Sequence, residues 1–244
     1  MNEDRIHHLS TVIADEQQPK QTRLSAIFEL VGTPKSDDAC LQLLDDHEPS
    51  GFPGRDIRHA LLTHGNCVDA LCVLLWSEDS AIRRAAVRRL RITKASTIGS
   101  DLGCLLANEL AARPRDRDLI IQTLDTLGVC LPMNERPVPP AVVQAVADPD
   151  PTVRCIAAGV LRRVGLRDAV AGDALLLHLN DPQPAVRIAA LELIAVLSPP
   201  QQAIPAIKAL ALADPDDLVR WVARYELSRH SIQLDEQHMP PQAA

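Results

Sequence analysis

Aromatic residues are scarce in this 244-residue chain, at 2% of the sequence, and long apolar runs are missing as well. No stretch approaches the roughly 18 apolar residues that a membrane span needs, and the first thirty residues lack the basic start and apolar centre of a signal peptide. Alanine and leucine are abundant, whereas strand-forming residue types are few. We therefore expect an all-α, soluble, cytoplasmic protein with no membrane partner.

The familiar sequence signatures of catalysis are also missing. The chain has no G-x-S-x-G, H-E-x-x-H, phosphate-binding loop or dinucleotide-binding glycine pattern. Its six cysteines form no C-x-x-C pair and no zinc-ligand spacing with histidine, and His7 and His8 are better explained as exposed residues than as metal ligands. We expect no enzyme activity, no metal and no cofactor. The cysteines are interpreted as buried free thiols: Cys40, Cys67, Cys72, Cys104, Cys130 and Cys155.

The formal net charge is −7, which weakens any attraction of the chain as a whole to nucleic acid. A local basic patch could still bind phosphate, and the distribution of charge is therefore more informative than its sum.

One seven-residue motif recurs in the second half of the chain. Residues 148–154 read DPDPTVR, residues 181–187 read DPQPAVR and residues 214–220 read DPDDLVR. Arg154, Arg187 and Arg220 are consecutively 33 residues apart. Such a fixed period is the signature of a repeat architecture.

Each copy of the motif marks a corner between two helices. An amphipathic run precedes it, at residues 141–147, 174–179 and 203–213. Small and aliphatic residues follow the arginine by three and seven positions, which places them on one helical face. Aspartate accepts hydrogen bonds from free amides and proline fits the first turn of a helix, so the motif makes a rigid corner. The spaced residues are Ala157, Ala190, Ala223, Leu161, Ile194 and Leu227.

Weaker copies extend the pattern to the start of the chain. Arg83 with Ala86 and Leu90 is a good match, and three degenerate copies fill the remaining positions. About seven units then span residues 2–230. The degenerate copies are Thr22-Arg23 with Ala26 and Leu30, Ile57-Arg58 with Ala60, and Leu119-Ile120 with Thr123 and Leu127.

The corner Asp-Pro-x-Pro-x-Val-Arg with its spaced alanine and leucine resembles HEAT repeats, particularly the short repeats of phycobilin lyase subunits. The resemblance covers nearly the whole chain, most closely residues 137–230 and fairly residues 66–95. It implies an α-solenoid of about seven HEAT-like two-helix repeats. It also implies an inter-repeat ladder in which the corner residues are scaffold: Asp148, Asp181, Asp214, Arg154, Arg187 and Arg220.

Two irregular segments and a tail interrupt this pattern. The proline- and glycine-rich segment from Asp45 to Arg58 predicts an expanded corner followed by a short second helix. The segment from Cys130 to Pro140 is either a bend between two subarrays or a long connection. We expect a single solenoid over residues 1–230, with this bend near 130–140, and a flexible tail over residues 231–244.

A solenoid offers one extended inner surface, usually lined by the second helix of each unit. Residues one, five and eight positions after the corner arginine are predicted to project from it. In the third unit these are Arg84, Arg88 and Arg91, and in the seventh they are Trp221, Tyr225 and Ser228. The fifth contributes Cys155, Gly159 and Arg162, and the sixth Ile188, Glu192 and Ala195.

Two clusters on this surface are candidate binding sites. The six cations Arg83, Arg84, Arg88, Arg89, Arg91 and Lys94 lie within 12 residues, with no acidic residue between Ser80 and Ser100. They either bind an acidic protein segment or phosphate, or are paired with carboxylates of adjacent units. Trp221, Arg224 and Tyr225 either form a partner contact or cap the last repeat beneath the tail.

Three further polar residues predicted on the strip, His59, Asp125 and Glu192, are interpreted as solvated. Arg113, Arg115 and Arg117 alternate with Asp116 and Asp118 and predict a self-neutralised turn.

The leading hypothesis is a cytoplasmic adaptor, regulatory subunit or neutralising partner that grips another protein through a concave face. One alternative is nucleic-acid binding, as in the alkylpurine DNA glycosylases that also use HEAT-like repeats. Those enzymes use an aromatic-rich, strongly basic concavity that this acidic sequence mostly lacks. Another alternative, implied only by the resemblance, is a lyase or chaperone subunit that handles a cofactor-bearing partner.

Overall fold

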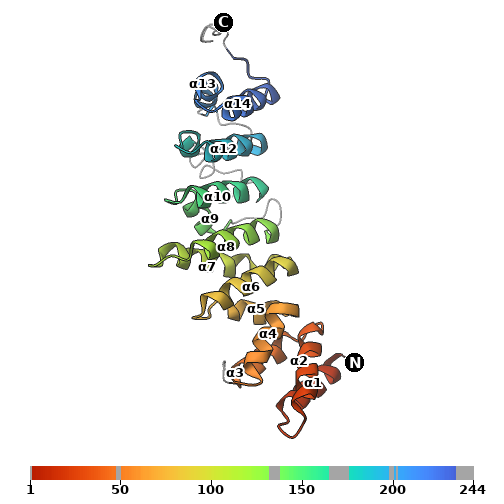
Figure 1. Ribbon diagram of the computed structural model, residues 1–244. Helices are drawn as coiled ribbons and strands as arrows, with labels where there is room; N and C mark the ends of the chain where they lie inside the picture. Colours follow the sequence, from red (N-terminus) through yellow and green to blue (C-terminus); the bar gives the residue numbers. More distant parts are fainter. Residues whose placement is uncertain are drawn as a thin grey trace. The chain divides into compact units, whose positions relative to one another are not determined.

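The structure, a computed structural model, describes residues 2–47, 51–131, 138–164, 176–197, 201 and 203–234 (Figure 1). Helices and their connections account for all of these residues, and no strand occurs among them. The helices are α1 (Asn2–Ala14), α2 (Lys20–Gly32), α3 (Asp37–Asp45), α4 (Gly54–His64), α5 (Val68–Leu74), α6 (Ser80–Thr93), α7 (Gly99–Ala111), α8 (Arg117–Cys130), α9 (Pro140–Ala145), α10 (Pro151–Val164), α12 (Pro184–Leu197), α13 (Ile204–Ala213) and α14 (Asp217–Arg229), with a short 3-10 turn at Ser96–Ile98.

The helices follow one another as the predicted two-helix units. The pairs are α1 with α2, α3 with α4, α5 with α6, α7 with α8, α9 with α10, a short helical stretch at 176–179 with α12, and α13 with α14. The fold is therefore the all-α solenoid of about seven repeats that the sequence predicts. The chain divides into two compact units, Met1–Leu105 and Leu106–Ala244.

Within each unit the second helices pack side by side. In the C-terminal unit, α8 packs on α10, α10 on α12 and α12 on α14, as Figure 1 shows. In the N-terminal unit α2 packs on α4 and α4 on α6. The core between helices is made of the spaced residues of the motif, and Ala157, Ala190 and Ala223 are fully buried. Each repeat therefore buries its apolar side against its neighbour, as expected for repeat proteins.

The degenerate N-terminal copies obey the same burial pattern. Ala26 and Leu30 of α2 are buried, as are Ile57 and Ala60 of α4. The predicted irregular corner before α4 is confirmed, because α3 ends at Asp45 and α4 begins at Gly54 and has 11 residues. Of the other predicted irregularities, residues 132–137 and the tail from 235 onward lie outside the described residues.

The corner aspartates hold the backbone of each turn. Asp148, Asp181 and Asp214 each accept a hydrogen bond from the amide two residues later, at 2.9 Å. Two further aspartates cap the helices that follow: Asp150 accepts from the Thr152 amide, and Asp216 from the Leu218 amide. The chain therefore satisfies the free amides of these helix starts with its own side chains.

The same aspartates join successive repeats. Arg154 Nε donates to Asp181 Oδ2 at 2.7 Å, and Arg187 Nη2 donates to Asp214 Oδ1 at 2.7 Å. Each of these arginines also donates to the carbonyl oxygen of its own corner aspartate, at 2.8 Å. The ladder that the resemblance implied is therefore present between the fifth, sixth and seventh repeats. Arg220, in the last repeat, donates to the Asp214 carbonyl and pairs with Asp217.

The prediction of a self-neutralised turn at residues 113–118 was only partly right: Arg117 lies 3.9 Å from Asp118, but the turn also pairs with the next repeat. Arg115 pairs with Asp148, and Arg117 pairs with Asp150 and donates to the Thr152 hydroxyl at 2.9 Å. These arginines thus extend the ladder from the fourth repeat to the fifth. The sequence could not show this, because partners 33 residues apart compete with neighbouring carboxylates for the same guanidinium groups.

The interpretation of every cysteine as buried was also only partly right. Cys40, Cys67 and Cys130 are buried, Cys72 and Cys155 are half-buried, and Cys104 is exposed. Cys104 lies on the exposed side of α7, between the buried residues Leu102 and Leu105. Helical periodicity alone did not separate its position from theirs.

The ladder leads to a stability prediction. The side chains of Arg187 and Asp214 are 9% and 2% exposed, so Arg187→Ala leaves a buried carboxylate without its cation. We expect the free energy of unfolding to fall by about 3 kcal/mol, measured by urea denaturation. Arg162→Ala, which removes an exposed pair with Glu192, is the control and should cost no more than about 1 kcal/mol. Equal losses would contradict a special role for the ladder.

A buried histidine gives a pH prediction. His178 is 4% exposed, its Nε2 lies 2.6 Å from the Val146 carbonyl oxygen, and burial lowers its pKa from the ordinary 6.5. His178 therefore binds its proton more weakly in the folded chain than in the unfolded chain, and its contribution to stability decreases as the pH falls through about 6.5. We expect the loss of stability between about pH 7.5 and 5.5 to be smaller in His178→Gln than in the wild type. Parallel pH profiles for the two proteins would contradict this, and His7→Gln is the exposed control.

Candidate partner-binding surface

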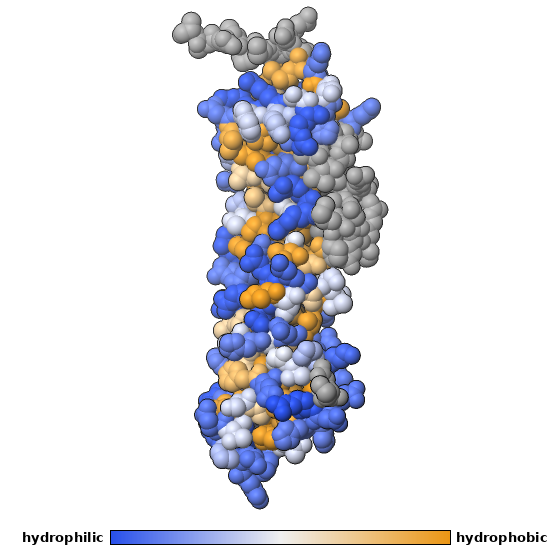
Figure 2. All heavy atoms as spheres, turned by 90° about the vertical axis from the view of Figure 1, so that its right-hand side faces the viewer, coloured by the Kyte–Doolittle hydropathy of each residue, from blue (hydrophilic) through white to orange (hydrophobic). Residues whose placement is uncertain are grey.

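The second helices of the C-terminal unit carry a strip of side chains that face away from the core. Figure 2 shows a face of the molecule on which hydrophobic and hydrophilic residues are interspersed. Cys155 and Gly159 of α10 and Ile188 of α12 are half-buried, whereas Trp221 and Tyr225 of α14 are 62% and 50% exposed. Trp221 and Tyr225 therefore lie outside the core, as the sequence predicted, whereas the positions on α10 and α12 are partly covered.

Ion pairs connect neighbouring helices along this strip. Arg162 of α10 lies 3.6 Å from Glu192 of α12, and Arg163 of α10 lies 3.6 Å from Asp125 of α8. All four side chains are at least one third exposed, so these pairs contribute little stability. Glu192 and Asp125 are thus solvated but paired, and Arg162 reaches a partner molecule only in competition with Glu192.

The last helix carries an exposed apolar cluster, here called the α14 surface and defined by Leu218, Trp221 and Tyr225. The three residues are spaced at i, i+3 and i+7 and therefore share one helical face. The Trp221 and Tyr225 rings stack with centroids 5.6 Å apart and an interplanar angle of 8°. Leu218 is 57% exposed, and the sequence analysis missed it because it lies inside the corner motif. Its spacing to Trp221 was the signal that could have revealed it.

Arg224 is less available to a partner than the sequence suggested. Its Nε donates to the Ala211 carbonyl oxygen at 2.9 Å, near the end of α13. Arg229 lies close to the aromatic cluster, because its guanidinium group is 5.9 Å from the centre of the Tyr225 ring. The alternative interpretation, in which the tail covers Trp221 and Tyr225, concerns residues outside the described part of the chain.

In the N-terminal unit, the basic helix α6 divides into structural and outward-facing arginines. Arg83 Nη1 donates to the Ser77 and Glu78 carbonyl oxygens, both at 2.9 Å. Arg89 donates to the Gly65 carbonyl at 2.7 Å and to the His64 carbonyl at 2.9 Å, so it caps the end of α4. The guanidinium groups of both residues therefore stabilise the fold by donating hydrogen bonds to backbone carbonyl groups.

The remaining arginines of α6 form what we call the α6 surface, defined by Arg84, Arg88 and Arg91. Arg84 is half-buried, and Arg88 and Arg91 are exposed. Ile92, which the sequence analysis did not single out, is 66% exposed beside them. The α6 surface thus combines positive charge with an apolar side chain.

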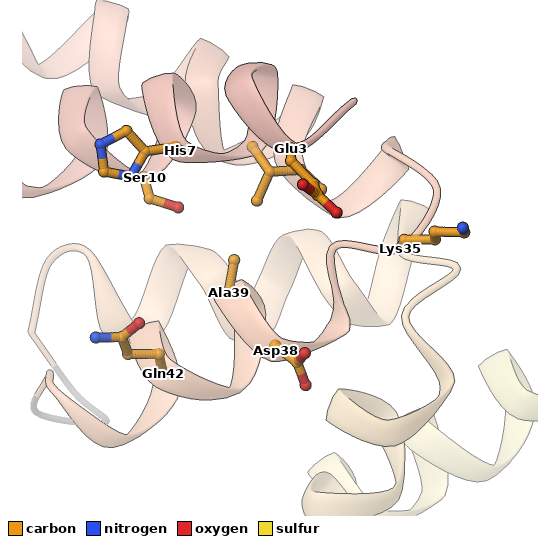
Figure 3. Close-up of a pocket in the computed structure, with 8 residues that line it drawn as sticks. Glu3, His7, Ser10, Lys35, Asp38, Ala39 and Gln42 are labelled. Carbon is orange, nitrogen blue, oxygen red and sulfur yellow. The ribbon is translucent and has the colours of Figure 1, made fainter. Parts of the chain in front are cut away.

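A groove of about 790 Å³ lies between the first helices of the first two repeats (Figure 3). Glu3, His7 and Ser10 of α1 face Asp38 and Gln42 of α3 across it, and Lys35 lies at one end. No second helix contributes to its lining, so it is separate from both surfaces above. Over the described residues, no group of three or more His, Cys, Asp or Glu side chains is placed to hold a metal ion.

Comparisons with known proteins agree with this architecture. Residues 138–228 match the HEAT repeats family. A search of curated proteins gave no match. Among solved structures, the chain is similar to an archaeal HEAT-like repeats protein from Thermococcus onnurineus NA1, with a TM-score of 0.52 and 16% identity over 95% of this chain and 97% of that one.

Two other solved structures match over most of their length with lower TM-scores. One is the complex of CpcE and CpcF of phycocyanin lyase from Nostoc sp. PCC7120, at 0.41 and 22% identity over 98% of this chain and 91% of that one. The other is human deoxyhypusine hydroxylase in complex with glycerol, at 0.42 and 16% identity over 94% and 97%. The family match of residues 138–228 and the archaeal structure confirm the resemblance to HEAT repeats, and the fold is an α-solenoid of HEAT-like repeats.

One further property is visible in the described helices. None of them combines the length and the apolar character that crossing a membrane requires.

The exposure of the α14 surface predicts that its residues contribute little to folding. We expect Trp221→Ala and Tyr225→Ala to change the free energy of unfolding by no more than about 0.5 kcal/mol. Leu227→Ala on the same helix should cost about 3 kcal/mol, because Leu227 is 2% exposed and its removal leaves a cavity. Urea denaturation of the three variants checks the difference. A large loss for either aromatic variant would show that the ring is part of the core.

Proposed function

We propose that this chain is a protein-binding scaffold or adaptor that holds another protein on the outward face of its second helices. The observation that carries the proposal is the exposure of Trp221 and Tyr225, two of only five aromatic residues in the chain. Aromatic side chains in water leave a large apolar area unburied, and aromatic residues dominate the energetics of binding at protein interfaces. The cytoplasm is the proposed setting.

The position of the aromatic residues supports this function. They lie on α14, the end member of a packed row that also contains α8, α10 and α12. A row of rigid helices fixes exposed side chains relative to one another, which limits the entropy lost when a partner binds. The repeat scaffold therefore presents the α14 surface in a preorganised form.

The α6 surface supports a partner with an acidic segment. Helix α6 has no acidic residue, and the side chain of Arg88 is exposed. Guanidinium groups bind carboxylates through paired hydrogen bonds, and the exposed Ile92 adds apolar contact. We propose that this surface binds an acidic segment of a protein. Binding of nucleic acid to it instead would contradict this proposal.

The test is an affinity measurement on the full chain with a partner captured from the native host and identified by mass spectrometry. Trp221→Ala should weaken binding by about 30-fold, the loss typical of an aromatic hot spot. Trp76→Ala is the matched control, because Trp76 is 49% exposed but follows a first helix, α5. Wild-type affinity in the Trp221 variant, or an equal loss in both, would contradict the α14 surface as the binding site.

A second variant tests the acidic partner. Arg88→Glu should reduce the affinity for the same protein, and the difference from wild type should shrink as the salt concentration rises. The control is Arg113→Glu, which reverses the charge of an exposed residue in the turn between α7 and α8. The assignment to an acidic segment would be contradicted if Arg88→Glu abolished a salt-dependent binding of DNA or RNA and left the binding of the protein unchanged.

A further inference from the structure

Two cysteine thiols meet inside the N-terminal unit. Cys40 Sγ and Cys67 Sγ lie 3.5 Å apart, and the residues are 0% and 2% exposed. Cys40 is in α3, the first helix of the second repeat, and Cys67 is the residue before α5, the first helix of the third repeat. The two sulfur atoms therefore face each other across the boundary between neighbouring repeats.

A network of hydrogen bonds holds both sulfur atoms in place. Ser36 Oγ is 3.1 Å from Cys67 Sγ and 3.9 Å from Cys40 Sγ. The Ser36 hydroxyl shares its one proton between the Leu30 and Thr33 carbonyl oxygens, at 2.8 Å each, and so is itself fixed at the end of α2. Cys67 Sγ also lies 3.6 Å from the Val31 carbonyl oxygen. The thiols are thus positioned by polar contacts, unlike cysteines that only fill an apolar core.

The two thiols are not equivalent. The hydrogen bond from Cys40 lowers the pKa of Cys67, because it stabilises the Cys67 thiolate, although burial acts in the opposite direction. The same contact, together with burial, raises the pKa of Cys40. Cys67 is therefore the thiol that ionises first, and Cys40 lies within reach to react with it afterwards.

We infer that Cys40 and Cys67 form an oxidisable dithiol, which a hydroperoxide converts into a disulfide that links the second and third repeats. The inference does not rest on the proposed function. The sulfur atoms need to approach by about 1.5 Å to reach the disulfide bond length of about 2.05 Å.

The chemistry balances with hydrogen peroxide as the oxidant. The Cys67 thiolate attacks one peroxide oxygen, the O–O bond breaks, and hydroxide leaves and takes up a proton to become water. Cys67 is now a sulfenic acid. The Cys40 sulfur then attacks the Cys67 sulfur, the S–O bond breaks, and a second water leaves as the S–S bond forms. Two thiols are oxidised in total and one peroxide is reduced to two waters.

Burial determines the order in which the cysteines react. Cys104 is exposed and meets the oxidant first, whereas Cys40 and Cys67 react only when peroxide enters or the contact between α3 and α5 opens. A test therefore has to remove the exposed thiol. It also has to remove Cys72, because trypsin leaves Cys67 and Cys72 in one peptide, residues 59–83.

The experiment uses the full chain with Cys72→Ala and Cys104→Ser, reduced, desalted and then treated with hydrogen peroxide. We expect the intact mass to fall by two hydrogen atoms. Tryptic digestion without reductant should yield residues 36–55 joined to residues 59–83, and reductant should separate them. Adding Cys40→Ser should abolish the link and leave Cys67 as a sulfenic acid or a further oxidised form. Circular dichroism of each variant confirms that its helices are intact.

A stability measurement provides an independent readout. The disulfide constrains the unfolded chain, so the oxidised protein should unfold at a temperature several degrees higher than the reduced protein. The variant with Cys40→Ser should show no such increase after the same treatment. The inference is overturned if both thiols remain alkylatable after oxidation and denaturation, or if the linked peptides contain other cysteines.

Discussion

The ion pair between the corner arginine of one repeat and the corner aspartate of the next is the interaction on which the C-terminal unit depends. Asp181 and Asp214 each do two things, since each closes its own turn through an amide and receives the preceding repeat's guanidinium. Local folding of the corner and stacking of repeats are thus coupled through one carboxylate. Because the group is buried, losing either role leaves an unsatisfied charge.

The position of each arginine on its helix explains which polar residues remain available for binding. Arginines that face the corners or the helix ends, such as Arg154 and Arg89, are bound to carboxylates and carbonyls of the scaffold. Those on another side of a second helix, such as Arg88, which directly precedes Arg89, are exposed. The repeat therefore separates scaffold from surface by helical position rather than by residue type. A binding surface can change while the ladder stays intact, which fits an architecture that is compatible with many functions.

The thiol pair illustrates a different consequence of stacking. Cys40 and Cys67 are 27 residues apart in sequence, yet the packing of α3 on α5 brings their sulfur atoms within 3.5 Å. Composition suggested small core residues, and burial alone agreed with that interpretation. The contact between Ser36 and Cys67 and the contact between the two thiols distinguish a chemical pair from core packing.

Sequence alone determined the repeat period, the corner motif and the burial of residues such as Ala157, because helical spacing and the proline corner are local properties of the chain. It also placed Trp221 and Tyr225 outside the core through the same spacing. Tertiary structure decided which charges of different repeats meet: Arg115 binds Asp148, and Arg162 meets Glu192. Such pairings depend on the distance between helices of different repeats, which no local pattern encodes.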